Sequence, residues 1–107
     1  MNNKIILFWS NIPSKNGYTN YIDWQNSELK FSPFHELVFK AHERLNNTVE
    51  LWTFQKISNF PYNNITIKNA NEYIDPKIAF DCLEKGHSIA FLADAIRLKR
   101  AAEVLGI

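Results

Sequence analysis

Residues 32–54, which read SPFHELVFKAHERLNNTVELWTF, contain a helix followed by a strand. Ser32 before Pro33 is typical of a helix start, because serine caps free backbone amides and proline fits the first helical position. Glu36 in the first turn suits the positive end of the helix dipole. Apolar residues then recur at helical spacing, namely Phe34, Leu37, Val38, Ala41 and Leu45. The pattern predicts an amphipathic helix from Ser32 to about Asn46.

The segments on either side of this helix predict two parallel strands. Thr48–Phe54 is rich in β-branched and aromatic residues, which favour a strand. Upstream, Lys4–Trp9 is a short apolar run, typical of a strand that is buried on both faces of a parallel sheet. A strand, a helix and a strand of these lengths form a right-handed crossover unit, so we expect the sheet to be parallel.

Two other segments of the first 70 residues are more polar. Ser10–Lys30 contains Pro13, Gly17 and several asparagines and shows no lasting period, so we predict a long loop. After a turn-rich stretch over Ser58–Asn64, the β-branched residues of Ile65–Ile67 predict a short third strand.

The last third of the chain predicts two helices. Asp75 and Pro76 begin a short helix that is expected to run to about Lys85 and to stop at Gly86, which can adopt the left-handed cap. Ser88 begins the final helix. Its apolar residues form one stripe at helical spacing, made of Phe91, Ala95, Leu98, Ala102 and Leu105.

Composition limits the domain count and the classes of partner. The chain has 107 residues, of which 46% are hydrophobic, so it can form one domain over residues 1–107 with one core. A formal charge of +1 creates no long-range field, which argues against nucleic acid as a partner. The apolar run after Met1 is too short for a signal peptide or a membrane span, and Cys82 is the only cysteine. We therefore expect a cytoplasmic protein without disulfides.

Asp94 and Arg97 are the first candidates for ligand contacts. They are three residues apart in the final helix and so lie on neighbouring faces at the margin of the apolar stripe. Ala90, Ala93 and Ala101 surround them, and small side chains leave room for a ligand. Spacing alone favours a simpler interpretation, a surface ion pair worth about 0.3–0.5 kcal/mol.

Trp9 is the other candidate, because it closes the first strand. Ligands of open α/β sheets bind outside the carboxyl ends of parallel strands, and an aromatic ring there can stack on a nucleobase. A tryptophan packed into the core is an equally good interpretation, and it is the one we prefer for Trp24 and Trp52. With only 3 glycines the chain has no dinucleotide-binding fingerprint, and it has no nucleophile-elbow pattern.

Four blocks of the chain together resemble one family. They are Ile5–Ser10, Ser32–Leu37, Val49–Phe54 and Phe91–Arg97, and the resemblance covers nearly the whole chain. The family is that of glycosyltransferases with a DXD sugar-binding region, which include capsular polysaccharide synthesis enzymes and, more distantly, the large clostridial glucosylating toxins. The resemblance implies part of a nucleotide-diphospho-sugar transferase fold, which is GT-A-like and Rossmann-like, with a small and mostly parallel sheet flanked by helices.

The last block is the most specific one. In the family an acidic residue, three before an arginine, opens a helix that ends in a Gly-Gly pair, followed by an aromatic residue and the Asp-X-Asp signature. Asp94, Arg97, Gly106 and Ile107 fall in register with this pattern, whereas Ala93 stands where serine is common and Leu105 replaces the first glycine.

The resemblance also implies roles for individual residues. Asp94 and Arg97 would contact the ribose, sugar or phosphates of a nucleotide sugar, which we expect to be a UDP-sugar. Trp9 would stack on the uracil, with Phe8 and Ser10 beside it in the same block. We expect Trp9, Asp94 and Arg97 to face one cleft.

The metal and the catalytic step belong to the complete enzyme. Mn²⁺ or Mg²⁺ is expected there, but the Asp-X-Asp signature would follow Ile107, so this chain offers no ligands for the metal and no catalytic residue. A divalent ion stabilises the diphosphate leaving group, and we therefore expect the chain to be inactive alone as a donor-binding part truncated before the signature.

Two other functions stay open. In the first, the chain is a catalytically inactive nucleotide-binding or interaction module. In the second, it is a non-functional truncated gene product. An unpaired strand edge or an exposed apolar helix face would also promote self-association.

Overall fold

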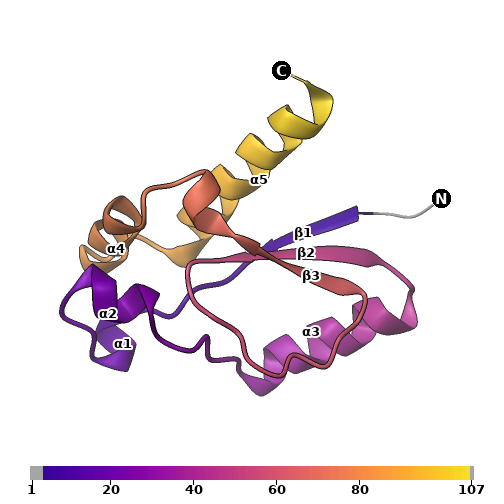
Figure 1. The fold of residues 1–107 in the computed structure, drawn as a ribbon, viewed down its shortest axis with the longest axis horizontal. Coiled ribbons are helices and arrows are strands. Elements are labelled where there is room, and N and C mark those ends of the chain that lie inside the picture. Colours follow the sequence, from indigo (N-terminus) through magenta and orange to yellow (C-terminus); the bar gives the residue numbers. More distant parts are fainter. Residues whose placement is uncertain (1–3, 107) are drawn as a thin grey trace.

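Three parallel strands form a small sheet in the computed structural model, which describes residues 4–106. Strands β1 (Lys4–Phe8), β2 (Thr48–Thr53) and β3 (Ile65–Asn69) lie in the order β1-β2-β3 (Figure 1). Both pairs are parallel, and Leu7 of β1 lies opposite Leu51 of β2. The expected mixed α/β architecture, a small parallel sheet with flanking helices, is confirmed.

Helices cover both faces of the sheet. Helix α3 (Pro33–Arg44) packs on one face and α5 (Ile89–Leu105) on the other (Figure 1). Because side chains alternate along a strand, neighbouring residues of β1 enter different cores. Phe8 belongs to the core cluster on the α5 side, whereas Trp9 packs against the cluster that contains Phe39 of α3.

The helix starts predicted from the sequence are confirmed. The Ser32 hydroxyl accepts a hydrogen bond from the amide of His35 at 3.4 Å, and this caps α3. Asp75 accepts one from the amide of Lys77 at 2.9 Å and caps α4 (Pro76–Glu84). The limits of both helices lie within two residues of the prediction. Their starts are predictable because a cap made by neighbouring residues does not depend on the rest of the fold.

The long loop predicted for Ser10–Lys30 is wrong. This segment contains two short helices, α1 (Pro13–Asn16) and α2 (Tyr21–Gln25). Proline at the first position starts α1, and the Asn20 side chain caps α2 by accepting from Asp23. Helices of four or five residues contain too few turns to show an apolar period, which explains why the sequence pattern missed them.

These short helices enclose a tryptophan. The side chain of Trp24 in α2 is 0% exposed, and its ring packs against Phe54 and Phe80. Helix α4 packs against both α1 and α2 beyond the carboxyl ends of the strands (Figure 1). A 3-10 turn, η1 (Ala70–Glu72), connects β3 to this group and was not predicted. Trp24 and Trp52 are both core residues, as expected.

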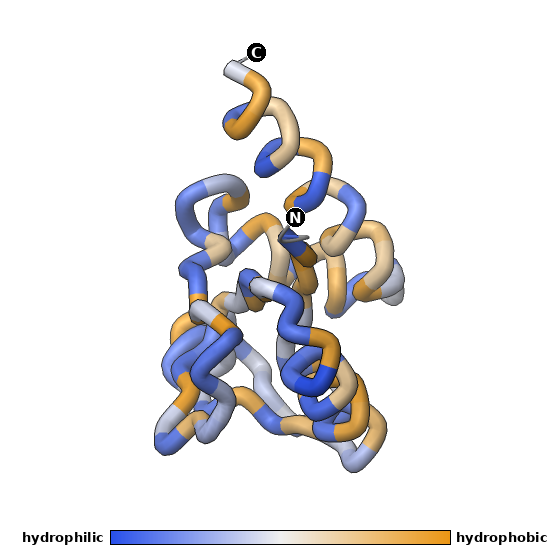
Figure 2. The backbone as a smooth tube through the Cα atoms, turned by 90° about the vertical axis from the view of Figure 1, so that its right-hand side faces the viewer, coloured by the Kyte–Doolittle hydropathy of each residue, from blue (hydrophilic) through white to orange (hydrophobic). Residues whose placement is uncertain are grey.

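The apolar stripe predicted for the final helix exists but faces away from the sheet. The residues of α5 that enter the core are Leu92, Ala93 and Ile96. Ala93 therefore fills the core and leaves no room for a ligand, which corrects the role expected for it. Figure 2 shows apolar positions recurring along α5 up to its carboxyl end. Because α5 is apolar on two sides, spacing alone could not decide which side is buried.

In helix α3 the predicted apolar stripe lies beside the buried face and not on it. Phe39 is its buried residue, with Val38 and His35 half-buried beside it. The predicted apolar stripe lies next to this buried face and is largely exposed, at Phe34, Leu37, Ala41 and Leu45. Two helices of this small fold therefore each present apolar side chains to the outside.

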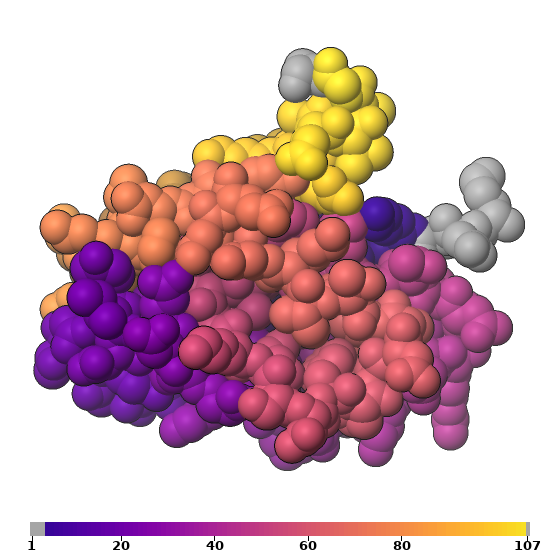
Figure 3. Space-filling view, viewed as in Figure 1, coloured from indigo at the N-terminus to yellow at the C-terminus, as the bar shows by residue number. Residues whose placement is uncertain are grey.

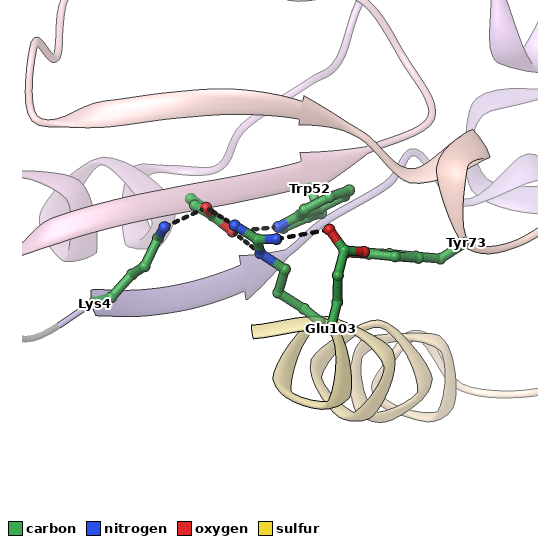
Figure 4. Close-up of polar contacts among 6 residues, drawn as sticks. Lys4, Trp52, Tyr73 and Glu103 are labelled. Atoms are coloured by element: carbon green, nitrogen blue, oxygen red, sulfur yellow. Dashed lines mark hydrogen bonds and ion pairs between the residues drawn. The ribbon is translucent and has the colours of Figure 1, made fainter. Parts of the chain in front are cut away.

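A buried carboxylate joins α5 to the sheet. Glu50 of β2 is 3% exposed, and Arg100 of α5 donates to it through Nε at 2.9 Å and Nη2 at 2.8 Å (Figure 4). Lys4 of β1 contacts the same carboxylate at 2.8 Å, and the indole of Trp52 donates to it at 3.0 Å. Arg100 also bonds to Glu103, which accepts a hydrogen bond from Tyr73. Both carboxylate oxygens of Glu50 therefore have hydrogen-bond or ion-pair partners.

The pKa of Glu50 reflects this balance. Burial alone would raise the pKa, but hydrogen bonds from Arg100, Lys4 and Trp52 outweigh burial and lower the pKa from 4.5 to about 2. The folded-state pKa is depressed, so the stabilisation is complete above about pH 4.5 and is lost as the pH falls towards 2.

Substituting Glu50→Gln is expected to remove this contribution, about 3 kcal/mol of unfolding free energy at neutral pH, because Arg100 and Lys4 lose their shared buried carboxylate. Urea denaturation at a series of pH values measures the effect. The variant should also lose the steep fall in stability between pH 4.5 and 2. Glu84→Gln, which changes an exposed carboxylate of α4, is the matched control. Equal stability of the two variants would contradict the role of Glu50.

Candidate functional site

The carboxyl ends of β1 and β2 are joined by buried polar side chains. Ser10 is 0% exposed, and its hydroxyl donates to Oε1 of Gln55 at 2.9 Å. The same oxygen accepts from the amide of Asn11 at 3.0 Å, and Nε2 of Gln55 donates to the carbonyl of Trp24 at 3.3 Å. These bonds satisfy polar groups at a strand edge where the ladder ends. Ser10, a predicted ligand contact, is therefore occupied by an internal partner.

Asn11 organises the chain around this edge. Its Nδ2 donates to Oγ of Ser27 at 3.0 Å and to the carbonyl of Glu28 at 2.9 Å, and its Oδ1 accepts from the amide of Lys30 at 3.0 Å. The indole of Trp24 donates to the Asn11 carbonyl at 2.7 Å. One buried side chain thus holds the segment from Ser27 to Lys30 beside the end of β1. Asn11 was not among the predicted site residues, although its position two residues after the predicted strand was a usable signal.

Trp9 borders an open hollow at this edge. The hollow has a volume of about 250 Å³, and its lining includes Trp9, Asn11, Lys15, Lys30, Ser32 and His35. We call it the Trp9 hollow. The indole of Trp9 donates to the carbonyl of Lys30 at 3.0 Å, and its ring lies 4.3 Å from that of His35. Two lysines and no carboxylate line the hollow, so its charge suits an anion.

The imidazole of His35 is a neutral neighbour of the Trp9 ring. Partial burial lowers the pKa of His35 below its ordinary value of 6.5. Its Nδ1 accepts from the amide of Ser32 at 3.0 Å, so the proton of the neutral ring lies on Nε2. The ring therefore supports Trp9 without adding a charge to the hollow.

Asp94 and Arg97 form an exposed ion pair on the opposite face of the sheet from Trp9. Arg97 Nη1 lies 3.2 Å from Asp94 Oδ1, and the side chains are 48% and 73% exposed. Nε of Arg97 also donates to the carbonyl of Ile6 at 3.4 Å. Backbone groups of successive strand residues point to alternate edges. The amide of Trp9 points to β2, where it donates to the carbonyl of Trp52, so the carbonyl of Ile6 points to the opposite, unpaired edge of β1. Arg97 therefore covers part of that edge.

The structure brings some of the predicted site residues together and not others. Asp94 and Arg97 contact each other, but neither lines the Trp9 hollow, so the expectation that Trp9, Asp94 and Arg97 face one cleft is wrong. Phe8 packs edge-on against Phe54 in the core, with 5.8 Å between ring centroids, so its side chain has no free face. The alternation of side chains along β1 causes this separation, since α5 lies over Phe8 and α3 over Trp9.

Three further observations concern the described residues. A second hollow of about 270 Å³ lies at the carboxyl ends of β2 and β3, and Lys56, Lys68 and Asn69 are among its lining residues. Within residues 4–106, no three His, Cys, Asp or Glu side chains are grouped so that they could hold a metal ion. In the same part of the chain, no helix has the length and apolar character that crossing a membrane requires.

Replacing Asn11 with alanine is expected to cost about 1–3 kcal/mol of unfolding free energy, because three part-buried hydrogen bonds lose a partner. Thermal or urea denaturation measures the loss. Asn71→Ala, at an exposed position of η1, should change stability by less than about 0.5 kcal/mol. If both variants unfolded like the wild type, Asn11 would not hold this edge.

Comparisons of the chain with protein-family models, with curated proteins and with solved structures found no match. The family indicated by the four sequence blocks therefore stays a prediction, and so do the roles that the resemblance implies. Of the pattern in the last block, Gly106 adopts the left-handed cap with φ of 74°, while Ile107 lies outside the described residues.

Proposed function

We propose that this chain binds a nucleotide sugar, with a UDP-sugar as the expected donor, and is the donor-binding part of a DXD-type glycosyltransferase with a GT-A-like fold. The observation that carries the proposal is the position of Trp9. It lies half-buried at the carboxyl end of the first strand of a parallel sheet, beside a hollow that two lysines line.

The position of the Trp9 hollow supports a nucleotide as ligand. Open parallel sheets bind ligands outside the carboxyl ends of their strands. One side of the Trp9 ring contacts His35, and the ring remains partly exposed. Stacking of a base on such a ring contributes about 1–3 kcal/mol. The hollow is smaller than the pockets of about 300–1,000 Å³ typical of whole ligands, so in this proposal it takes the base and the ribose.

The charges around this edge support a diphosphate beside the base. Lys15 and Lys30 line the hollow. On the α5 side, Leu92 and Ala93 pack in the same cluster as Phe8, which places the first turns of α5 near the end of β1. Asp94 and Arg97 lie in the second and third turns of α5, and Arg97 reaches the carbonyl of Ile6. Their ion pair is exposed and therefore weak, so a ligand that crosses the strand end can replace it at small cost.

Donor binding, and not sugar transfer by this chain alone, is the proposed role. Mn²⁺ or Mg²⁺ would neutralise the diphosphate in a complete enzyme, where the Asp-X-Asp signature of the resembled family would hold the ion. No catalytic step is therefore assigned to these residues. A cytoplasmic location belongs to the proposal, since the lone Cys82 is a free thiol, which suits a reducing compartment.

Calorimetric titration of UDP, with and without Mn²⁺, tests the proposal. Trp9→Ala is expected to weaken UDP binding about tenfold or more, because it removes the stacking surface. Lys15→Ala with Lys30→Ala should weaken it further by removing both cations of the hollow. Lys85→Ala, at the exposed end of α4, is the matched control and should bind UDP like the wild type.

Arg97→Ala tests the α5 side of the site separately. We expect weaker UDP binding with an unchanged circular dichroism spectrum, since Arg97 is about half exposed and lies outside the core. Binding that is unaffected by both the Trp9 and the Arg97 substitutions would remove the proposed site. A wild-type protein that binds no UDP under either condition would remove the proposed donor.

A second function, that of an interaction module, is favoured by one specific observation. Both α3 and α5 present exposed apolar side chains, among them Phe34, Leu37, Phe91 and Leu98. Exposed apolar surface that recurs along a helix is typical of protein–protein contact. The two functions are compatible, because the Trp9 hollow lies at the strand ends and the most exposed of these residues lie outside it.

A further inference from the structure

The exposed face of α5 has the repeat of a helix that pairs with another helix. Its apolar residues are separated alternately by four and three positions, at Phe91, Ala95, Leu98, Ala102 and Leu105. We call these five residues the outer stripe. Alternating steps of four and three give an average of 3.5 residues, which is the period of a coiled-coil seam. In that pattern the phenylalanine and the leucines occupy d positions, and the two alanines occupy a positions.

The three large residues of the outer stripe are exposed in the monomer, and its two alanines are half-buried. Phe91, Leu98 and Leu105 are 62%, 73% and 72% exposed, because the opposite side of α5 carries the core residues. The carboxyl end of α5 extends past the sheet and stands clear of the body (Figure 3). Nothing in the described part of the chain covers the leucines there, and an apolar stripe of this kind in water favours association.

We propose that a second copy of this chain covers the outer stripe, so that the two α5 helices pair in parallel as a short coiled coil. The stripe is on the opposite side of α5 from the core, so in this arrangement the two bodies lie back to back. Alanine at the a positions lets the helices approach closely, and leucine at d is the residue found there in two-stranded parallel coiled coils.

Charges flanking the stripe point to a copy of the same helix. Asp94 occupies a g position, and Lys99, five residues later, occupies an e position. In a parallel pair a g residue faces the e residue five positions later on the partner helix, so Asp94 of each copy faces the partner's Lys99. An antiparallel pair brings g near g and e near e and does not join these two residues. In the monomer Lys99 donates to the exposed carbonyl of Tyr73, a contact that water can replace.

Two other surfaces are poorer candidates for self-association. The exposed residues of α3 are spaced by three, four and four positions and do not keep the alternating repeat. The unpaired edge of β1 is partly covered, since Arg97 donates to the carbonyl of Ile6. Association through the sheet edge, which the sequence suggested, is therefore less well supported than association through α5.

The expected dimer is reversible. From Phe91 to Leu105 the stripe is about 21 Å long, given a rise of about 1.5 Å per residue. Its pairing buries less than the roughly 1,200 Å² of a standard interface. The dimer should therefore form at high protein concentration and dissociate on dilution.

Sedimentation velocity of the full chain over a range of concentrations tests the proposal. The average mass should rise from that of the monomer towards twice that value. Leu98→Glu should weaken the dimer about tenfold or more, because it introduces a charge at the centre of the seam. Leu37→Glu, a matched change at an exposed position of α3, should leave the dimer unchanged. A wild type that stays monomeric, or a dimer that survives Leu98→Glu, would overturn the proposal.

A charge exchange tests the parallel arrangement. Asp94→Lys alone and Lys99→Asp alone should each weaken the dimer, because each places like charges opposite one another. The double variant Asp94→Lys with Lys99→Asp should restore the affinity of the wild type, since the pair is reversed and not removed. Failure of the double variant to recover would overturn the parallel pairing.

Discussion

The contact between Glu50 and Arg100 decides how α5 packs on the sheet. A carboxylate taken out of water costs several kcal/mol unless donors surround it, and the donors here come from β1, β2 and α5. Helix α5 is apolar on two sides, so hydrophobic burial alone does not select its orientation. Arg100 lies on the same side as Ile96 and reaches Glu50 only when that side faces the sheet. The ion pair thus selects which side is buried and leaves the outer stripe exposed.

The carboxyl edge of the sheet depends on a second polar group of the same kind. Ser10, Asn11 and Gln55 use their hydrogen bonds on one another and on the backbone of α2 and the segment after it. This network closes the end of β1 and leaves Trp9 at its border, with the ring on the α3 side. Phe8, one residue earlier, is on the other side and packs in the core. Trp9, the side chain on which the proposed ligand site depends, is therefore kept out of the interior by the hydrogen bonds of Ser10, Asn11 and Gln55.

Much of the fold, and less of the site, could be predicted from the sequence. Strands and helix starts depend on local signals, such as Ser32 before Pro33, and these act the same way in any fold. The short helices after Pro13 and Asn20 carry no period, and the buried side of α5 depends on Glu50, a residue on another element. Trp9 could be placed at a strand end, but its separation from Asp94 and Arg97 follows from which helix covers which face. Asn11 and Gln55 act through contacts with distant residues, which spacing does not show.

The burial of the tryptophans gives the protein a built-in optical probe. Trp24 and Trp52 are 0% and 1% exposed, whereas Trp9 is half-buried with an imidazole against its ring. The emission of the two enclosed indoles is shielded from solutes, and that of Trp9 is not. Quenching by an added solute, or a change of emission wavelength, therefore reports mainly on a single indole at the carboxyl edge of the sheet.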